Sequence, residues 1–385
     1  MRVMQNSEFR IQTGSIWKSD AVSMDIGLHS EFSRIPRFSS YNPPHKESLM
    51  RVAHLTVAAL LVAIGYAIAP GLNAQARLPV GPIAENCNRA CLEGVMNQYL
   101  DALVAKDPKR LPLSTDVKYT EQEQVMAVGD GFWKTVTARG NYNHYFADPV
   151  GNQVGWMGTM REKGGVLLMS VRLRVQLGRI TEIEKSFFRA GGGGPNNIAA
   201  MDKDPQPEAL WLQPIPAAQR ASRQQLINVA NAYFEGVQKN DGKGFYPFTK
   251  DCDRLENGSH TTNVPGSKPT TPNFNYMGSD CKTQLESGYL AIVNNVHHRR
   301  FPLVDEERGV VWANCVFDMD GTVTEIKLAT TGEVANMSGF AGRASSIHVT
   351  EVFRIENGLI RRVEMIGTSV PYHFNSTWGP FLSGK

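Results

Sequence analysis

The sequence predicts an α+β chain with two tandem domains that share one order of helix and strands. The prediction depends on an internal repeat, on an amphipathic helix followed by alternating strands in each copy, and on a Gly/Pro-rich stretch between the copies. Hydrophobic residues make up 42% of the 385 residues and charged residues 20%, as in ordinary globular proteins. A formal net charge of +3, without a basic run, gives no reason to expect a nucleic-acid partner.

The repeat is visible first in a helix and in the polar segment that follows it. Residues 93–121 align with residues 228–256 once a single one-residue insertion is allowed. The matched pairs are Tyr99 with Tyr233, Asp107 with Asp241, Asp116 with Asp251, and Glu121 with Glu256. Apolar residues recur at helical spacing in both copies, so each copy begins with an amphipathic helix.

A long hairpin is predicted to close each copy. Leu177-Gly178 separates two alternating runs in the first copy, and Asn357-Gly358 separates two in the second. Such turn residues between alternating apolar runs are typical of a tight hairpin. The second copy also carries two polar insertions, residues 257–281 and 318–345, which we expect to be loops.

These patterns set the expected domain boundaries. We expect a poorly ordered extension over residues 1–49 (which a mis-assigned start would explain), a signal peptide over 50–76, repeat 1 over 85–190, a Gly/Pro linker over 191–221, repeat 2 over 222–372 and a C-terminal tail over 373–385.

The signal peptide is predicted from a basic start, an uncharged run over residues 55–72 and an Ala-x-Ala site that ends at Ala76. An uncleaved membrane anchor is the alternative, because the run has nearly the length needed to span a bilayer. Both interpretations place most of the chain outside the cytoplasm, in the periplasm or secreted, where disulfides persist. Cys252 and Cys281 flank the first insertion, and we expect them to be bridged. Cys87 and Cys91 are a second candidate pair, and Cys315 is expected to be a core thiol.

The chain resembles the SnoaL-like members of the nuclear-transport-factor-2-like superfamily. The resemblance rests on the helix with Tyr99 to Asp107, on the strand that ends at Glu121, and on the Gly-x-Ile-x-x-Ile/Val-Glu hairpins. It implies two cone-shaped domains, each a curved antiparallel sheet packed on helices, with a ligand held in the cone. Members of the superfamily include isomerases, polyketide cyclases, dehydratases, hydrolases, lyases and non-enzymatic binders, so the fold alone does not choose the chemistry.

Glu351 is the clearest candidate for a catalytic side chain. Period-2 alternation places it on the same face as Val349 and Phe353, and a carboxyl on an apolar face is either paired or has a raised pKa. The structural alternative is a salt bridge, with Arg362 as a suggested partner.

A second candidate cluster follows the first helix of repeat 2. It combines Glu256 as a further catalytic candidate with the binding candidates Asp253, Arg254, Asn257 and His260. The alternative is a solvated turn. A bridged Cys252 would hold this cluster rigid, as a site requires.

Three further groups of residues are candidates for a site. Tyr119 in repeat 1 matches the position of the second cluster, and His298 and Arg300 could orient a substrate or simply form an exposed basic turn. Asp130 and His144 could form an acid–base pair beside an aromatic wall, with core packing as the alternative for the rings. The wall residues are Trp133, Tyr142 and Tyr145.

The resemblance, with the candidate residues, implies an exported, cofactor-independent lyase, isomerase or hydratase that moves a proton on a small aromatic or oxygenated molecule. Formaldehyde elimination from lignin-derived compounds, as in some relatives with this fold, is one variant that the resemblance implies. Glu351, Glu256 or His144 would act as the base, and Tyr119 or Arg300 would stabilise the anion. The alternative is a non-catalytic small-molecule-binding protein with one functional cone. We expect no metal and no cofactor, because no motif for either is present. Homo-oligomers remain open, and membrane contact is expected only through an uncleaved signal segment.

Overall fold

The computed structural model describes residues 81–192, 196–204 and 206–379. The predicted extension over residues 1–49 and the predicted signal peptide lie outside the described residues. Among the helices that are described, none is both long and apolar enough to cross a membrane.

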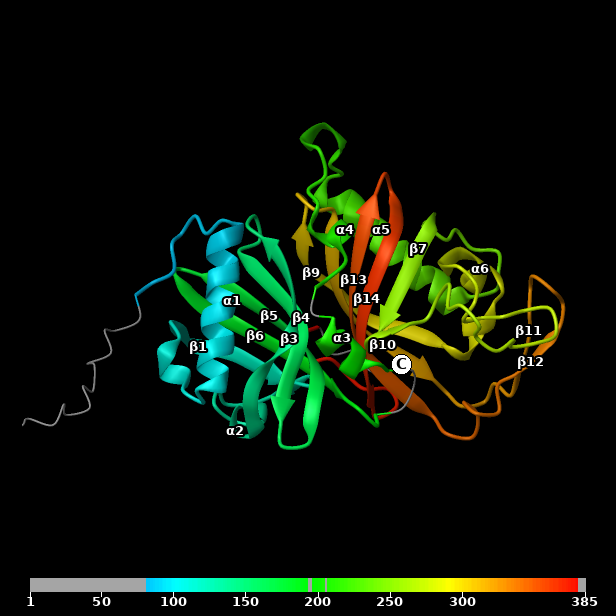
Figure 1. The fold of residues 1–385 in the computed structure, drawn as a ribbon, viewed down its shortest axis with the longest axis horizontal. Helices are drawn as coiled ribbons and strands as arrows, with labels where there is room; N and C mark the ends of the chain where they lie inside the picture. The colour runs from blue at the N-terminus through cyan, green and yellow to red at the C-terminus, as the bar shows by residue number, and fades with distance from the viewer. Residues whose placement is uncertain (1–80, 193–195, 205, 380–385) are drawn as a thin grey trace, which may run out of the picture. The chain divides into compact units, whose positions relative to one another are not determined.

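Repeat 1 consists of a long helix and one six-stranded sheet (Figure 1). Leu92, Met96 and Tyr99 lie on one face of the helix and are fully buried against the sheet, as their spacing predicted. The elements are α1 (Arg89–Val104), η1 (Pro108–Arg110), β1 (Leu113–Glu121), β2 (Gln124–Val125), α2 (Phe132–Thr135), β3 (Val136–Asp148), β4 (Gln153–Glu162), β5 (Gly165–Gln176) and β6 (Arg179–Arg189).

Repeat 2 follows the same plan with additional short elements. Its long helix begins with a capping box in which Ser222 and Gln225 exchange side-chain and backbone hydrogen bonds. The elements are α5 (Arg223–Lys239), β7 (Phe248–Glu256), β8 (Ser259–His260), α6 (Cys281–Glu286), η3 (Tyr289–Ile292), β9 (Asn295–Asp305), β10 (Val310–Met319), β11 (Glu325–Lys327), β12 (Val334–Asn336), β13 (Ser345–Glu356) and β14 (Leu359–Val370).

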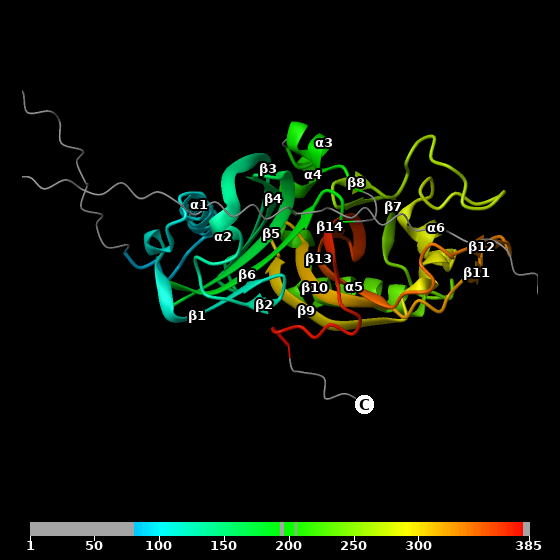
Figure 2. The same cartoon turned by 90° about the horizontal axis from the view of Figure 1, so that it is seen from below.

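The two sheets have the same strand order. It is β2-β1-β6-β5-β4-β3 in repeat 1 and β8-β7-β14-β13-β10-β9 in repeat 2, so each strand has an equivalent in the other sheet. The prediction of antiparallel sheets needs one amendment, because β1 pairs with β6 in parallel and β7 pairs with β14 in parallel. Figure 2 shows how the strands of each sheet curve, which confirms the predicted fold class of two curved sheets packed on helices.

Both predicted hairpins are observed. Leu177 and Gly178 have φ angles of 48° and 72°, and Asn357 and Gly358 have φ angles of 50° and 77°. Two successive positive φ angles are what a type I′ hairpin turn requires, and Asn and Gly tolerate them far better than Leu does. The conformation at Leu177, which is 95% exposed, is therefore imposed by the flanking strands.

The linker is more structured than a Gly/Pro stretch predicted. It contains α3 (Ile198–Lys203), α4 (Ala209–Leu212) and η2 (Ala217–Gln219). Ile198, Met201 and Trp211 are buried in an apolar cluster that also includes Trp312 of β10 and Val352 of β13. The linker helices therefore pack against the sheets instead of extending into solvent, and α3 contacts β3, β4 and β5 of repeat 1.

The two repeats contact each other through the sheets. Leu168 of β5 lies in the same apolar cluster as Val352 of β13 and Ile366 of β14. The Ser170 hydroxyl donates to Thr350 Oγ1 at 3.3 Å, which joins the equivalent strands β5 and β13 across the contact. The outer faces of the sheets are thus covered, and α1 and α5 pack on the opposite faces.

Both predicted disulfides are present, and Cys315 is a buried free thiol as expected. Cys87–Cys91 joins residues four apart, whereas Cys252–Cys281 joins β7 to the start of α6 across 29 residues. The second bridge closes the first insertion of repeat 2, so it holds that insertion against the sheet.

Candidate active site inside repeat 2

Glu351 lies inside repeat 2, on the face of β13 that packs against α5. Val349 and Phe353, its neighbours on that face, belong to the apolar core, and Glu351 itself is 1% exposed. Its Oε2 atom has no hydrogen-bond partner among the described residues. Burial, and then the negative charge of Glu256, raise the pKa of the Glu351 carboxyl to about 8. The carboxyl is therefore protonated at neutral pH.

Arg254, Glu256 and Tyr233 surround Glu351, and we call these four residues the Glu351 cluster. Arg254 Nε lies 3.4 Å from Glu256 Oε1, and Arg254 Nη1 lies 3.5 Å from the Tyr233 hydroxyl. Arg254 opposes the rise in the pKa of Glu351, as does a hydrogen bond from Tyr233. One guanidinium thus faces two carboxyl groups, and burial together with this imbalance raises the pKa of the more deeply buried one.

The suggested salt bridge between Glu351 and Arg362 is not present. Arg362 Nε instead donates to Glu208 Oε2 at 2.6 Å, at the outer face of the sheet. The pleat explains the difference, because Arg362 and Val363 of β14 point to opposite faces and only Val363 lies in the interior core.

Two residues of the cluster's surroundings were missed by the sequence analysis. Tyr276 accepts from Arg254 Nη2 at 3.1 Å, and Gln284, which is fully buried, also accepts from this nitrogen. Gln284 in turn donates to the Thr261 and Tyr276 carbonyl oxygens, each at 2.6 Å. Tyr276 comes from the disulfide-closed insertion, whose irregular sequence carries no periodic signal, and Gln284 comes from the short helix α6 that follows it.

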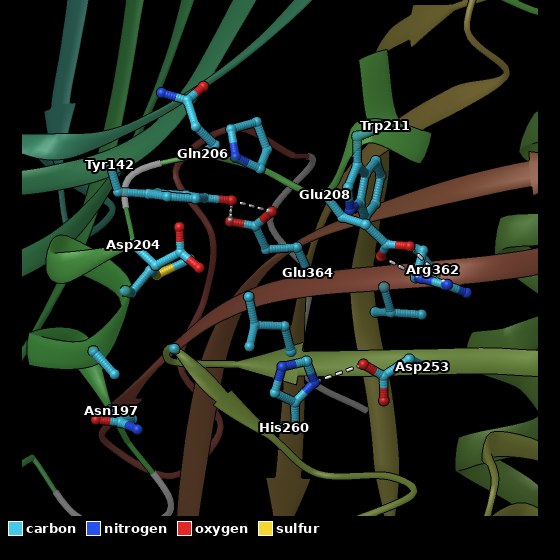
Figure 3. A pocket seen from close by; sticks show the side chains of 16 residues that line it. Tyr142, Asn197, Asp204, Gln206, Glu208, Trp211, Asp253, His260, Arg362 and Glu364 are labelled. Atoms are coloured by element: carbon cyan, nitrogen blue, oxygen red, sulfur yellow. Dashed lines mark hydrogen bonds and ion pairs between the residues drawn. The ribbon is translucent and has the colours of Figure 1, made fainter. Parts of the chain in front are cut away.

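The pleat of β7 divides the predicted second cluster between two faces. Arg254 and Glu256 point into the repeat, whereas Asp253 and His260 line a pocket of about 520 Å³ on the outer face (Figure 3). The Asn257 side chain neither points into the repeat nor lines the pocket. It forms two hydrogen bonds, of 3.0 and 3.1 Å, with the backbone of Gly367. Asn257 therefore ties a turn to β14.

Asp253 and His260 form an ion pair at the edge of that pocket. His260 Nδ1 lies 2.6 Å from Asp253 Oδ2, and the Thr262 hydroxyl donates to Asp253 Oδ1 at 2.6 Å. The hydrogen bond to Asp253 raises the pKa of His260. Against the effect of burial, the hydrogen bonds from His260 and Thr262 lower the pKa of Asp253.

Repeat 1 has a different arrangement at the equivalent positions. Its Lys185, Glu121 and Tyr119 form what we call the Lys185 cluster. Lys185 Nζ lies 2.9 Å from Glu121 Oε2, which also accepts from the Tyr119 hydroxyl at 2.9 Å. Lys185 is fully buried, and burial lowers its pKa to about 8. The sequence analysis missed Lys185, although it alternates with Ile183 and Phe187 just as Glu351 does with its neighbours.

The aromatic candidates of repeat 1 are core or partly buried side chains. Trp133 is 1% exposed and packs edge-on against Tyr99, with ring centroids 5.7 Å apart. The Tyr145 hydroxyl donates to Asn97 Oδ1 at 2.7 Å and accepts from Arg139 Nη2. Core packing, the alternative considered for these rings, accounts for Trp133.

Asp130 and His144 do not form a pair. Asp130 is exposed and forms an ion pair with Lys134, one turn away. His144 is 1% exposed, and its Nδ1 atom lies 2.8 Å from Glu364 Oε2 of repeat 2. The sequence placed both residues in one repeat, whereas the partner of His144 comes from the other repeat across the sheet contact.

His298 and Arg300 lie outside the Glu351 cluster. His298 Nε2 lies 3.2 Å from Asn375 Oδ1 in the C-terminal tail. Arg300 pairs with Glu184 of repeat 1 and lies 3.7 Å from the buried Glu123. Arg300 therefore contributes to the contact between the repeats. In the part of the chain that the structure describes, no three His, Cys, Asp or Glu side chains are grouped to hold a metal ion.

Comparison with known proteins gives one match in sequence. Residues 219–367 match a family model described as "Domain of unknown function (DUF8021)", which covers most of repeat 2 and no part of repeat 1. No curated protein matches the chain.

Solved structures match single repeats. An NTF2-like protein of unknown function from Cytophaga hutchinsonii is 14% identical, and the match covers 25% of this chain and 89% of that chain with a TM-score of 0.22. A putative polyketide cyclase from Pseudomonas putida is 18% identical, with 25% and 90% covered and a TM-score of 0.21. IdmH, a putative polyketide cyclase from Streptomyces antibioticus, is 11% identical, with 37% and 91% covered and a TM-score of 0.24.

The order of elements, a long helix followed by a curved six-stranded sheet in which the first strand pairs with the last, occurs twice. The chain therefore consists of two tandem repeats of one α+β fold, a long helix packed on a curved six-stranded sheet.

Proposed function

We propose that repeat 2 is a cofactor-free acid–base enzyme domain in which the Glu351 cluster transfers protons on a small carbonyl compound. The observation that carries the proposal is the position of the Glu351 carboxyl, which is buried near Arg254 with one oxygen atom unpartnered and whose pKa is raised by that burial. Two carboxyl groups whose environments drive their protonation apart are typical of general acid and general base pairs. Glu256 is the second member of this pair.

In the proposed reaction, Glu256 removes a proton from the carbon next to the carbonyl group, and Glu351 donates its proton to the carbonyl oxygen. The product is the enol, and no electron acceptor or cofactor is needed. Arg254 stabilises the negative charge that develops on the oxygen, because a buried guanidinium interacts with such a charge far more strongly than an exposed one does. Isomerisation or dehydration would follow from the enol. Loss of formaldehyde from a β-hydroxy carbonyl compound would instead produce the enol: Glu256 would take the hydroxyl proton, the carbon–carbon bond would break, and Glu351 would protonate the carbonyl oxygen.

The exposure of the cluster suits this division of roles. Glu351 is 1% exposed and Arg254 is 2% exposed, whereas the Glu256 side chain is 22% exposed. The cluster thus extends from the dry interior toward solvent, which would let Glu256 exchange its proton with water after each turnover.

We further propose that the protein acts outside the cytoplasm. Two disulfides support this location, because thiols are kept reduced in the cytoplasm of most organisms. The apolar run before Ala76 agrees with export.

The test is exchange of the α-protons of acetophenone in D2O, followed by NMR. We expect exchange above the buffer rate with the full chain, and a loss of at least about a hundredfold in Glu351→Gln, since general acids contribute about 10²–10⁴-fold. Glu162→Gln is the matched control, because Glu162 pairs with Arg189 in repeat 1 and lies outside the cluster. Ketone binding without exchange above buffer would instead favour the non-catalytic binding protein.

A further inference from the structure

The inter-repeat pocket lies outside both sheet interiors. It is lined by Tyr142 of β3, by the outer faces of β7, β8 and β14, and by linker residues, which are Asn197, Ala200, Met201, Asp204, Gln206, Pro207, Glu208 and Trp211. Its volume of about 520 Å³ falls in the range of small-molecule sites. Figure 3 shows Tyr142, Glu364 and Trp211 around one side of the pocket and His260 with Asp253 on another. The pocket is not used by the Glu351 cluster, so its occupant is a separate question.

The charges that line the pocket are mostly negative. Four carboxylates face it, against one guanidinium and one imidazole; the carboxylates are those of Asp204, Glu208, Asp253 and Glu364. His144 lies behind the pocket, against Glu364. With His144 and His260 both protonated, the carboxylates still outnumber the positive charges. A cation is therefore favoured inside the pocket at neutral pH.

The positive groups are already engaged by the protein. Arg362 donates to Glu208 Oε2 at 2.6 Å and to Oε1 at 2.8 Å, and its third nitrogen donates to the Asp251 carbonyl oxygen. His260 is held by Asp253. An anion would have to displace these contacts, so the pocket is poorly suited to a carboxylate or phosphate ligand.

Two carboxylates can still accept hydrogen bonds. Asp204 is exposed, and its side chain has no hydrogen bond or ion pair with another described residue, although its backbone N–H donates to the Ala200 carbonyl oxygen. Glu364 is a built part of the wall, because it is 2% exposed and accepts from the Tyr142 hydroxyl with both oxygens at 3.0 Å. Tyr142 therefore fixes the orientation of a carboxylate that lines the pocket.

Apolar and aromatic surface completes the lining. Trp211, Met201 and Leu255 lie beside the carboxylates, and the Tyr142 ring forms part of the same wall. Aromatic rings attract cations placed over their faces, and apolar side chains accommodate a hydrocarbon body.

We propose that the inter-repeat pocket binds a small protonated primary amine that carries an apolar body. The ammonium group donates hydrogen bonds to Asp204 and Glu364, and the apolar body contacts Trp211, Met201 and Leu255. The proposal stands apart from the acid–base function of repeat 2, because it concerns the opposite face of β7 and β14.

The test compares three probes of one shape by isothermal titration calorimetry with the full chain. The probes are phenethylamine, phenethyl alcohol and hydrocinnamate, which are cationic, neutral and anionic. We expect phenethylamine to bind at least about tenfold more tightly than the alcohol, with an affinity that falls as salt is added, and hydrocinnamate to bind more weakly than either. Equal or tighter binding of hydrocinnamate, or no binding of phenethylamine, would overturn the proposal.

The variant Asp204→Asn tests whether phenethylamine binds in this pocket. We expect the affinity for phenethylamine to fall about threefold to tenfold, as loss of one partly solvated charge predicts. Asp116→Asn is the matched control, since Asp116 is an exposed carboxylate on β1 of repeat 1, and it should change the affinity less than twofold. Equal effects of the two variants would locate the amine elsewhere and contradict the proposal. The measured quantity is binding and not turnover, so failure of the amine-binding proposal would leave the test of Glu351 unaffected.

Discussion

The interiors of the two repeats occupy equivalent positions in the same fold but differ in charge. In repeat 1 one carboxylate faces one ammonium group, so the buried charges of the Lys185 cluster balance. In repeat 2 two carboxyl groups face one guanidinium, so one carboxyl remains protonated. Balanced buried charges are structural, whereas an unbalanced buried carboxyl keeps a proton that it can transfer.

The equivalence follows from the strand pairing. Glu121 pairs with Lys185 in the parallel ladder of repeat 1, and Glu256 pairs with Met365 in that of repeat 2. Three positions then differ between the repeats: Tyr119 corresponds to Arg254, Lys185 to Met365 and Val171 to Glu351. The buried cation lies on the last strand, β6, in repeat 1 and on the first strand, β7, in repeat 2. In addition, β13 of repeat 2 carries a buried carboxyl that repeat 1 lacks at the equivalent position.

The largest expected effect on stability concerns the Lys185–Glu121 ion pair of repeat 1. Lys185→Met installs the residue found at the equivalent position of repeat 2 and leaves Glu121 without its cation. Because breaking a buried pair leaves an uncompensated charge, we expect a loss of about 3–5 kcal/mol in the free energy of unfolding. Urea denaturation at pH 7 measures the loss, and Lys185→Met with Glu121→Gln should recover part of it. A loss below about 1 kcal/mol would mean that the pair is not structural.

The two disulfides give the next comparison. The chain-entropy model predicts a loss of about 3–4 kcal/mol when the bridge across 29 residues in repeat 2 is removed, and about 2 kcal/mol for the bridge across four residues in repeat 1. Thermal or urea denaturation of the Cys252→Ser/Cys281→Ser and Cys87→Ser/Cys91→Ser variants measures both. The reverse order would show that the insertion contributes little to the fold of repeat 2.

The unbalanced carboxyl predicts a pH dependence of stability. The pKa of Glu351 is raised from 4.5 to about 8 on folding, so its contribution is fully present below pH 4.5 and is lost as the pH rises to 8. The loss has a slope of up to about 1.4 kcal/mol per pH unit. Urea denaturation between pH 5 and pH 8 should show this slope in the natural chain and a flatter profile in Glu351→Gln. The control Glu162→Gln, at a carboxylate paired with Arg189, should keep the slope.

The smallest expected effect is at a rejected candidate. Asp130→Asn removes an exposed ion pair with Lys134, and such pairs contribute about 0.2–1 kcal/mol at most. Both stability and ketone exchange should therefore be nearly unchanged. A large loss of exchange would return Asp130 to the candidate site and move the site to repeat 1.

The sequence was sufficient wherever local periodicity decides the structure. The hairpin turns and the inward position of Glu351 follow from alternation along single strands, and the repeat follows from matching two segments of the chain. The Cys252–Cys281 bridge was expected because the two cysteines flank the first insertion. Lys185 was within reach of the same reasoning, because alternation with Ile183 and Phe187 places it inside repeat 1.

Other features depend on contacts that no local pattern encodes. His144 meets Glu364 across the contact between the repeats, so its partner is more than two hundred residues away in sequence. Tyr276 reaches Arg254 from an irregular insertion, and Gln284 reaches it from the short helix that follows. The division of the second cluster between two faces follows from the pleat of β7, which was readable, but the pocket on the outer face is formed by the linker helices.

The most direct test of the unbalanced interior is the titration of Glu351 itself. Carbon-13 NMR of side-chain-labelled glutamate, with the resonance assigned by its absence in Glu351→Gln, reports the protonation of this carboxyl from pH 4 to pH 9. We predict a protonated carboxyl at pH 7 and a midpoint near pH 8. A midpoint near the ordinary value of 4.5 would show that Glu351 is an ionised partner of Arg254, and would contradict the proposed role of repeat 2.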